Sequence, residues 1–269
     1  MEKPTLNAII LAAGKGERLQ PLTNDKPKCL VELFGKSLLE WQIEAFQSSG
    51  ITDITIVSGY KSDLINFPEI TILKNEKYES TNMVETLFSA KEKMLDSTIV
   101  SYGDIIFEKN VLESLINSPN DISVIVDKQW KRLWGKRFQD PLSDAESLII
   151  EDGCIVEIGQ KVNSYEKICG QYIGLMKFQG SGIDLIKRHY EEAKNQANTG
   201  TNPLNASLPF EKSYLTDFLH SLIKDGATIK AVPINNGWLE VDTLSDLDLY
   251  EFLYKKGELV DFLDIQKHE

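Results

Sequence analysis

Short apolar runs recur along the first half of the chain, and amphipathic or polar stretches separate them. Runs of four to seven residues bounded by turn residues indicate buried β-strands. The sequence predicts strands at Asn7–Leu11, Asp53–Ser58, Thr71–Lys74, Ser97–Ser101 and Asp121–Asp127. The stretches between the first strands have helical patterns, so the alternation predicts β-α-β units and a mainly parallel sheet.

Two of the intervening stretches carry strong helix signals. The first begins with a capping box, Ser37 followed by Glu40, and ends at Gly50, which favours a left-handed stop. Its apolar face has helical spacing at Leu39, Ile43 and Phe46. The second begins at Asn82 as its cap. Its pattern predicts a helix as far as Leu95, one turn after another through Val84, Leu87 and Lys91.

The second half begins less regularly. Residues 129–147 are rich in charged and aromatic side chains without clean periodicity, and a turn at 151–153 predicts a hairpin. We interpret 129–170 as an inserted β-rich lid. Further elements are predicted at Tyr172–Phe178 (strand), Ile183–Ala193 (helix), after Ser213 (helix) and at Thr228–Ile234 (strand). Thr243, with Asp246 three residues on, caps a last helix, so 244–269 is predicted to be a C-terminal helical appendage.

These elements predict one α/β domain over residues 1–269, a doubly wound, mainly parallel sheet with helices on both faces and a small lid. The hydrophobic share of 42% is enough for a sizeable core. In such a sheet, ligands bind at the carboxyl ends of the strands. Polar residues that directly follow strands are therefore the first candidates for a site.

The formal net charge of −12 limits the kinds of partner. Nucleic acids and anionic membranes attract proteins through broad basic surfaces, so we predict neither as a partner. No apolar run reaches the length of a membrane span. The cysteines Cys29, Cys154 and Cys169 are scattered and form no C-x-x-C pair, which predicts reduced thiols and a cytoplasmic protein.

The most specific chemical signal directly follows the first predicted strand. Two nearby glycines let backbone N–H groups close around a phosphate, and small alanines let a flat base approach the main chain. We predict nucleotide binding by Leu11, Ala12, Ala13, Gly14, Lys15 and Gly16. Arg18 and Lys28 bring two cations to the same phosphates and are catalytic candidates. A Rossmann fingerprint would need glycine at Leu19, and the segment 35–37 lacks the first Walker glycine, since Leu30 occupies that place.

Candidate metal ligands follow two other apolar segments. Asp104 comes after the strand ending at Tyr102-Gly103, and Asp242 comes after the apolar segment that starts at Trp238. Carboxylates at this edge of a sheet suit Mg²⁺, which prefers oxygen ligands. Glu240 shares a strand face with Asp242 by alternation and is the third candidate. Asp104 could instead cap the following helix; near Asp242, Thr243 is already the candidate cap.

These motifs together resemble the signature of the nucleotidyltransferase family that makes nucleotide sugars, CDP-choline and related activated head groups. The resemblance runs through Leu11–Leu19, Pro21-Leu22-Thr23, Lys26-Pro27-Lys28, Tyr102-Gly103-Asp104 and Glu240-Val241-Asp242-Thr243. It implies a Rossmann-like nucleotidyltransferase fold, an NTP substrate, and Mg²⁺ held by Asp104 and Asp242. It also adds Gly103, Thr81 and Asn82 to the nucleotide-binding candidates.

The acceptor side departs from the sugar-specific branch of that family. That branch carries Glu-Lys-Pro where this chain has Gln160-Lys161-Val162. With Gly170–Gly174 and Thr81-Asn82, this stretch is more similar to the phosphocholine and phosphonate cytidylyltransferase branch, which includes enzymes of capsule decoration. The resemblance implies transfer of CMP from CTP to a small phosphorylated acceptor such as phosphocholine, aminoethylphosphonate or a phosphorylated amino acid. A sugar-1-phosphate nucleotidyltransferase, guanylyl transfer to a molybdenum cofactor and a non-catalytic nucleotide sensor remain alternatives.

Acceptor-binding candidates lie in and after the predicted lid, which the resemblance puts on the acceptor side. Lys161 is predicted to meet the acceptor phosphate; the alternative is a solvated surface lysine. Aromatic side chains could wall a pocket for an ammonium group through cation–π contacts, at Trp130, Trp134, Tyr172 and Trp238. The alternative for any one of them is a place in a small core. Ala12 and Ala13, with Asn82 nearby, are predicted to read a pyrimidine edge, which favours CTP.

Overall fold

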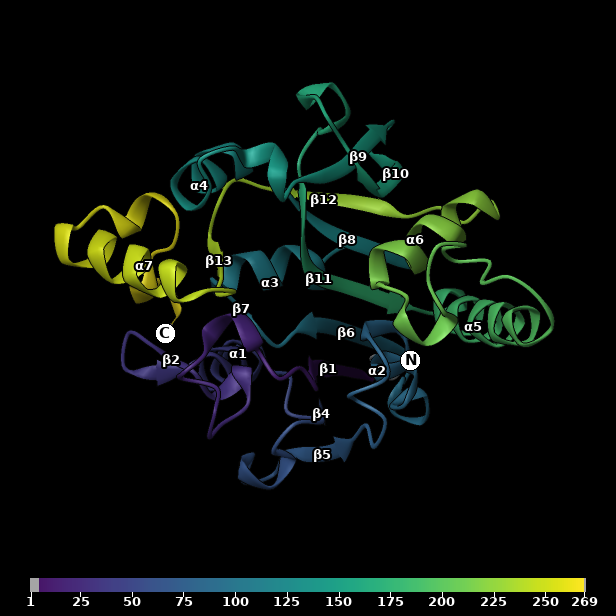
Figure 1. The fold of residues 1–269 in the computed structure, drawn as a ribbon, viewed down its shortest axis with the longest axis horizontal. Coiled ribbons are helices and arrows are strands. Elements are labelled where there is room, and N and C mark those ends of the chain that lie inside the picture. Colours follow the sequence, from purple (N-terminus) through teal and green to yellow (C-terminus); the bar gives the residue numbers. More distant parts are fainter. Residues whose placement is uncertain (1–4, 269) are drawn as a thin grey trace.

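The computed structural model describes residues 5–268. Its centre is a nine-stranded sheet in the order β5-β4-β1-β6-β11-β8-β12-β10-β9 (Figure 1). The strands are β1 (Leu6–Ala12), β4 (Ile54–Ser58), β5 (Thr71–Lys74), β6 (Ser97–Tyr102), β8 (Ile122–Asp127), β9 (Glu146–Glu151), β10 (Cys154–Lys161), β11 (Gln171–Gln179) and β12 (Lys230–Ile234). Because β10 and β11 run opposite to the other strands, the sheet is mainly parallel, as predicted.

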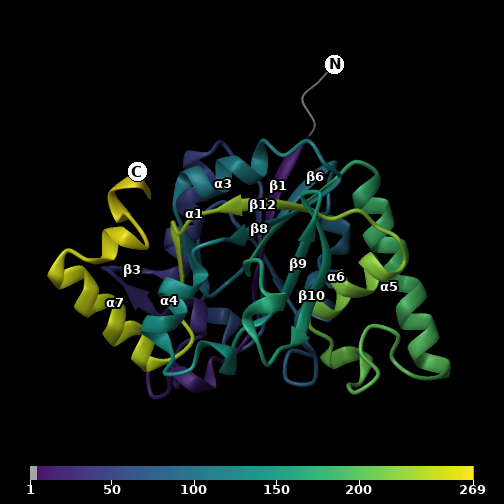
Figure 2. The same ribbon diagram turned by 90° about the horizontal axis from the view of Figure 1, so that it is seen from above.

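Helices cover both faces of this sheet, which confirms the predicted doubly wound α/β architecture (Figures 1 and 2). They are α1 (Leu38–Ser48), α2 (Met83–Phe88), α3 (Lys109–Ile116), α4 (Trp130–Arg137), α5 (Ser181–Thr199), α6 (Leu215–Lys224) and α7 (Leu244–Lys256). Alternation along β1 serves both layers: Ile10 packs with α1 and α3, and Ile9 packs with α2, α5 and α6. A strand buried on both faces is largely apolar, which explains the run from Ala8 to Ala12 in β1.

The predicted strands are confirmed to within one or two residues at each end. The first predicted helix is confirmed in detail. The amide of Glu40 donates to Ser37 Oγ at 3.2 Å, and the amide of Ser37 donates back to the Glu40 carboxylate at 2.7 Å. Gly50, just past the helix, has a left-handed φ of 81°. Local capping chemistry therefore determined both ends of α1.

The second predicted helix is shorter than the sequence indicates. Asn82 caps α2 by accepting a hydrogen bond from the amide of Met83, but the α-helix ends at Phe88 instead of reaching Leu95. The predicted stripe passed through Lys91, whose ammonium instead bonds Glu191 of α5 at 2.7 Å. Lys91 begins a 3-10 turn (Lys91–Lys93), and the chain then enters β6. A charged residue within an apolar stripe thus marked the end of the helix.

Residues 129–170 are only partly a β-rich segment. They begin with α4, continue through a 3-10 turn (Pro141–Ser143), and form the hairpin β9–β10, which extends the central sheet at its edge (Figure 1). The sequence pattern does not indicate α4, because its charged residues hide a narrow apolar face, formed by Trp130, Leu133 and Trp134. That face lies in the core. The assignment of this segment to the acceptor side stays a prediction.

Two short ladders complete the fold: β2 (Glu32–Leu33) pairs with β3 (Lys36–Ser37), and β7 (Ile105–Phe107) pairs with β13 (Trp238–Glu240). After β13 comes α7, whose predicted capping box at Thr243 and Asp246 is confirmed. Two 3-10 turns, Leu259–Asp261 and Ile265–His268, follow it. Across the described part of the chain, every helix is too short or too polar to cross a membrane.

Candidate active site

The loop after β1 is built around Gly16. Its φ of 71° is left-handed, and a Cβ there would lie 2.8 Å from Cβ of Lys28. Thr23 Oγ1 donates to the carbonyl of Gly16 at 2.7 Å and holds the loop from the other side. A side chain at position 16 would therefore be strained and would push Lys28 away. Gly16 thus lets the stem of Lys28 pack directly against the loop.

Asp104 lies at the same edge of the sheet because the ends of β1 and β6 are in close contact. The amide of Gly103, directly after β6, donates to the carbonyl of Leu11 in β1 at 2.9 Å. A Cβ on Gly103 would approach that oxygen to 2.8 Å and Cα of Ala12 to 3.1 Å. Only glycine allows this approach, and the residue after it, Asp104, is carried to the mouth of the loop.

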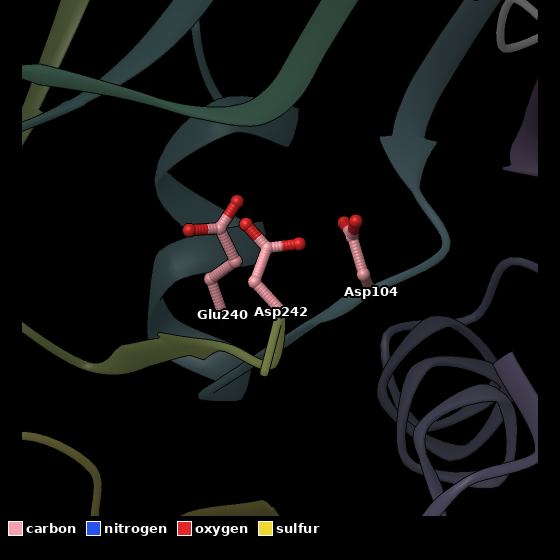
Figure 3. A group of neighbouring side chains, drawn as sticks. All are labelled: Asp104, Glu240 and Asp242. Carbon is pink, nitrogen blue, oxygen red and sulfur yellow. The ribbon is translucent and has the colours of Figure 1, made fainter. Parts of the chain in front are cut away.

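Asp242 comes from a distant part of the sequence. In the β7–β13 ladder, Glu240 pairs with Ile105, the residue after Asp104. The amide of Val241 then donates to the carbonyl of Asp104 at 3.0 Å. Figure 3 shows the result: Glu240 and Asp242 lie side by side at the end of β13, and Asp104 faces them from the segment after β6.

These three side chains form a carboxylate cluster. One oxygen from each of Asp104, Glu240 and Asp242 lies within 4.8 Å of the others. Within residues 5–268, Oδ1 of Asp104 is buried and has no hydrogen-bond partner. Burial and the nearby Asp242 carboxylate raise the pKa of Glu240 above its ordinary value. Convergent carboxylate oxygens are suited to a hard divalent cation.

Lys28 lies within this cluster. Its ammonium donates to Oδ2 of Asp104 at 2.6 Å and to Oδ1 of Asp242 at 2.5 Å. Burial acts to raise the pKa of Asp242, but the bonded Lys28 and the nearby Arg18 lower that pKa overall. Arg18 contacts the other oxygen of Asp242 at 3.0 Å, and its side chain is 63% exposed. The catalytic candidates Arg18, Lys28 and Asp104 are therefore brought together.

A pocket opens beside this cluster. It is lined by Leu11, Ala12, Ala13, Gly14, Lys28, Cys29, Tyr78, Thr81, Asn82, Met83, Thr86, Tyr102, Gly103 and Asp104. Most of the predicted nucleotide-binding residues are among them. Lys15, Gly16 and Arg18 lie in the adjoining loop rather than in this lining.

The polar side chains of the pocket wall are already engaged. Thr81 Oγ1 donates to the carbonyl of Lys77 at 2.9 Å. The Asn82 amide group donates to the carbonyl of Lys212 at 3.2 Å, and its oxygen accepts from Met83. Both side chains therefore hold the wall in place, and contact between Asn82 and a base edge stays a prediction.

Arg137 is a site residue that the sequence analysis missed. Its side chain is 1% exposed and donates to Glu240 at 2.7 Å and to Asp246 at 2.8 Å. Asp246 in turn accepts hydrogen bonds from the amides of Asp242 and Thr243, at 3.0 and 2.9 Å. Arg137 thus connects α4 to the carboxylate cluster. Nothing in the spacing of α4 distinguishes it from the other cations of that helix, and its role is visible only after folding.

Comparison with known families decides the class of this site. The model of the MobA-like NTP transferase domain matches residues 8–162. The chain belongs to this family. Transferases of this kind generally use a divalent metal, and the cluster at Asp104, Glu240 and Asp242 offers carboxylate oxygens for one.

Two proteins similar to this NTP transferase are cytidylyltransferases. A CTP:phosphoglutamine cytidylyltransferase of Campylobacter jejuni is 42% identical over 255 residues, 91% of this chain and 98% of that protein. A choline-phosphate cytidylyltransferase of Streptococcus pneumoniae is 31% identical over 151 residues, 53% of this chain and 66% of that protein. The solved structure of a CTP:phosphocholine cytidylyltransferase from S. pneumoniae covers 95% of this chain and 99% of its own, with 21% identity and a TM-score of 0.69, and confirms the fold.

The predicted acceptor residues of the transferase have different surroundings. Trp130 and Trp134 are 2% and 4% exposed, and Trp134 packs on Trp238 with ring centroids 5.9 Å apart. This burial favours the alternative interpretation, a place in the core, because α4 turns its apolar face inward, and an acceptor role for these indoles stays a prediction. Tyr172 is partly buried and packs edge-on against Tyr102 of the pocket wall, with centroids 5.6 Å apart. Lys161 is exposed at the end of β10, opposite Glu146.

An acidic wall, defined here as Asp144, Glu146 and Asp217, consists of neighbouring carboxylates: Asp217 and Asp144 both act on Glu146, and Asp242 of the cluster acts on Asp144. The transferase exposes Asp144 and Glu146 and buries Asp217 in α6. Partial desolvation, with Asp217 and Asp144 nearby, raises the pKa of Glu146 to about 7. The sequence analysis missed this wall because its members come from three separate segments.

Proposed function

We propose that the chain is a magnesium-dependent cytidylyltransferase that moves CMP from CTP to the phosphate or phosphonate of a small acceptor and releases pyrophosphate. One observation carries this proposal. Lys28 contacts the carboxylates of Asp104 and Asp242, and Arg18 contacts Asp242, at the mouth of a pocket beside a glycine loop. The 42% identity to a CTP:phosphoglutamine cytidylyltransferase over nearly the whole chain supports the choice of CMP.

The nucleoside would lie in the pocket, with its base against Ala12 and Ala13 and its phosphates toward Gly14 and Lys28. Small side chains at the end of β1 leave room for a flat ring against the main chain. The N–H groups of the loop suit phosphate oxygens. Arg18 is exposed at the loop and can present its guanidinium fork to the same oxygens.

Asp104 and Asp242, with Glu240 beside them, are the residues that would hold Mg²⁺. When bound, Mg²⁺ would neutralise charge on the triphosphate and polarise its phosphoryl oxygens. The donor set fits because these are carboxylate oxygens, one of them buried without a partner in the described chain. Arg137 holds Glu240 in place and, through Asp246, orients the main chain at Asp242.

In the reaction, an oxygen of the acceptor phosphate attacks the α-phosphorus of CTP in line. A new P–O–P bond joins CMP to the acceptor while the α–β bridge breaks, and its oxygen leaves with pyrophosphate. A phosphate monoester has a second pKa of about 6, so the acceptor is largely dianionic at neutral pH and needs no general base. This agrees with a site whose catalytic candidates are cations and carboxylates rather than histidine. Arg18 and Lys28 would stabilise the charge that develops on the phosphates.

We infer that the acceptor carries a positively charged nitrogen as well as a phosphate. Within the acidic wall, Asp144 is near Asp242 of the carboxylate cluster and Glu146 of β9 is near Asp144, on the side from which the acceptor would approach. Phosphocholine, aminoethylphosphonate and phosphorylated amino acids all combine these two charges, whereas sugar 1-phosphates do not. Lys161, across the hairpin from Glu146, would meet the acceptor phosphate.

We place this step in the supply of activated head groups for surface polysaccharides, and in the cytoplasm, where nucleoside triphosphates are made. The three cysteines are free, which agrees with a reducing compartment.

A substrate matrix tests the proposal. The purified chain is assayed for pyrophosphate release with each of the four NTPs against phosphocholine, aminoethylphosphonate, phosphorylated amino acids and sugar 1-phosphates. We expect release only with Mg²⁺ present, a kcat/KM for CTP above that for GTP, and a preference for a zwitterionic acceptor. A site that hydrogen-bonds one base edge leaves polar groups unpaired with another, which is the reason for the expected base preference. Equal kcat/KM for CTP and GTP would refute the base assignment, and activity confined to sugar 1-phosphates would refute the acceptor class.

A further inference from the structure

The position of the Lys28 ammonium carries an inference beyond its contact with phosphate. We propose that Lys28 is an internal cation that competes with the divalent metal for Asp104 and Asp242, so that the metal is loaded together with the triphosphate and not before it. The inference rests on the proposed function only in taking these carboxylates as metal ligands. On this proposal, Lys28 determines the order in which metal and triphosphate bind.

The geometry places a single ammonium between two metal ligands. Nζ of Lys28 lies 2.6 Å from Oδ2 of Asp104 and 2.5 Å from Oδ1 of Asp242. The side chains of all three are 13–16% exposed, so little water screens their attraction. One oxygen of each aspartate is therefore directed at the lysine. A metal that took both oxygens would have to displace it.

Two contacts at hydrogen-bond distance hold the ammonium against both carboxylates. A divalent cation and this ammonium cannot share the same two oxygens without strong repulsion. Binding of the metal to these oxygens therefore requires the ammonium to move away, and a second anion would stabilise it in its new place.

The glycine loop provides the place where that anion would bind. Lys28 lines the nucleotide pocket together with Gly14 and Asp104, and its stem lies against Gly16, as described above. A triphosphate held by the loop would offer oxygens to the ammonium within reach of its flexible stem. Lys28 would then move from the carboxylates to the phosphates, and the metal would take its place.

Arg18 offers a matched control because it also contacts a ligand of the proposed metal. It reaches one oxygen of Asp242 at 3.0 Å, but it is 63% exposed and does not bridge to Asp104. Removing Arg18 also deletes one positive charge from the site. It leaves Lys28 bound to Oδ2 of Asp104 and Oδ1 of Asp242. Comparing the Arg18 and Lys28 variants therefore distinguishes the effect on metal affinity of losing any positive charge from the effect of losing the ammonium that competes with the metal.

The test is direct binding of Mn²⁺, followed by electron paramagnetic resonance without nucleotide, to the wild-type chain, Lys28→Met and Arg18→Met. We expect Lys28→Met to bind Mn²⁺ at least about tenfold more tightly than wild type, on the scale of a hydrogen bond to a charged group. Arg18→Met should change the affinity much less. Added CTP should tighten Mn²⁺ binding to wild type by a larger factor than to Lys28→Met.

Unchanged or weaker Mn²⁺ binding by a folded Lys28→Met variant overturns the proposal, as does an equal gain in Arg18→Met. Circular dichroism establishes that each variant is folded. Lys28→Arg gives a second check, because it retains the charge and should not gain Mn²⁺ affinity as Lys28→Met does; an equal gain there also overturns the proposal. Pyrophosphate release by the wild-type chain tests the transferase function separately, so the two can fail independently.

Discussion

At the scale of single residues, Lys161 is the acceptor candidate that the fold leaves free to act. It is exposed at the end of β10, across the hairpin from Glu146 of the acidic wall. If it meets the acceptor phosphate, Lys161→Ala should raise the KM for the acceptor much more than the KM for CTP. The loss should be about 1.5–3 kcal/mol, the range for a hydrogen bond to a charged group.

Lys167→Ala is the matched control for this prediction. Lys167 is also an exposed lysine of the 129–170 segment, 60% exposed and 3.6 Å from Glu157. It should leave both Michaelis constants near wild type. Kinetics with each substrate varied separately decide the matter, and an unchanged acceptor dependence in Lys161→Ala would remove that residue from the site.

Residues whose chemistry is local could be predicted from the sequence. Gly16 and Asp104 follow strands in recognisable motifs, and the structure places both at the mouth of one pocket. Trp130 and Arg137 could not be predicted, because their surroundings depend on the direction in which α4 faces. The sequence around a tryptophan does not distinguish a side chain that lines a pocket from one that is packed in the core.

At the scale of elements, α4 is the helix that links the core to the carboxylates. Arg137, at its last turn, is buried with Glu240 and Asp246 on either side. Arg137→Met would leave those carboxylates buried without their cation, which typically costs about 3–5 kcal/mol. We expect that loss in the free energy of unfolding measured by urea titration.

Arg132→Met serves as the control from the same helix. Arg132 is 49% exposed, and its contact with Asp261 is 3.3 Å long, so its removal should cost about 1 kcal/mol or less. Equal stability losses in the two variants would show that the buried network around Arg137 contributes nothing specific to the fold.

Elements that begin and end with their own signals were predictable. The capping boxes of α1 and α7 and the apolar runs of β1 and β6 are local, and each has its expected place in the structure. Helix α5 continues to Thr199, beyond its predicted end at Ala193, because an exposed helix needs little apolar surface to continue. It stops where Gly200 interrupts it.

At the scale of the whole molecule, the site exists because strands distant in sequence meet at one edge. β1 and β6 are neighbours in the central sheet, and the β7–β13 ladder adds the segment that carries Glu240 and Asp242. The alternating pattern predicted a parallel sheet and therefore a shared edge. It could not predict the β7–β13 pairing, because short antiparallel ladders between distant segments leave no periodic signal.

If this edge of the sheet transfers CMP to a phosphorylated acceptor, Asp104 should be required for formation of the new P–O–P bond. The most direct measurement is a ³¹P NMR spectrum of CTP, Mg²⁺ and the acceptor most active in the substrate matrix, with wild type and with Asp104→Asn. We predict that wild type produces pyrophosphate together with the coupled resonances of a new P–O–P bond. The Asn variant should produce neither while remaining folded, because it loses an anionic ligand of a hard cation without opening a cavity. Pyrophosphate without a diphosphate-linked product, or normal turnover by a folded Asp104→Asn variant, would contradict the account.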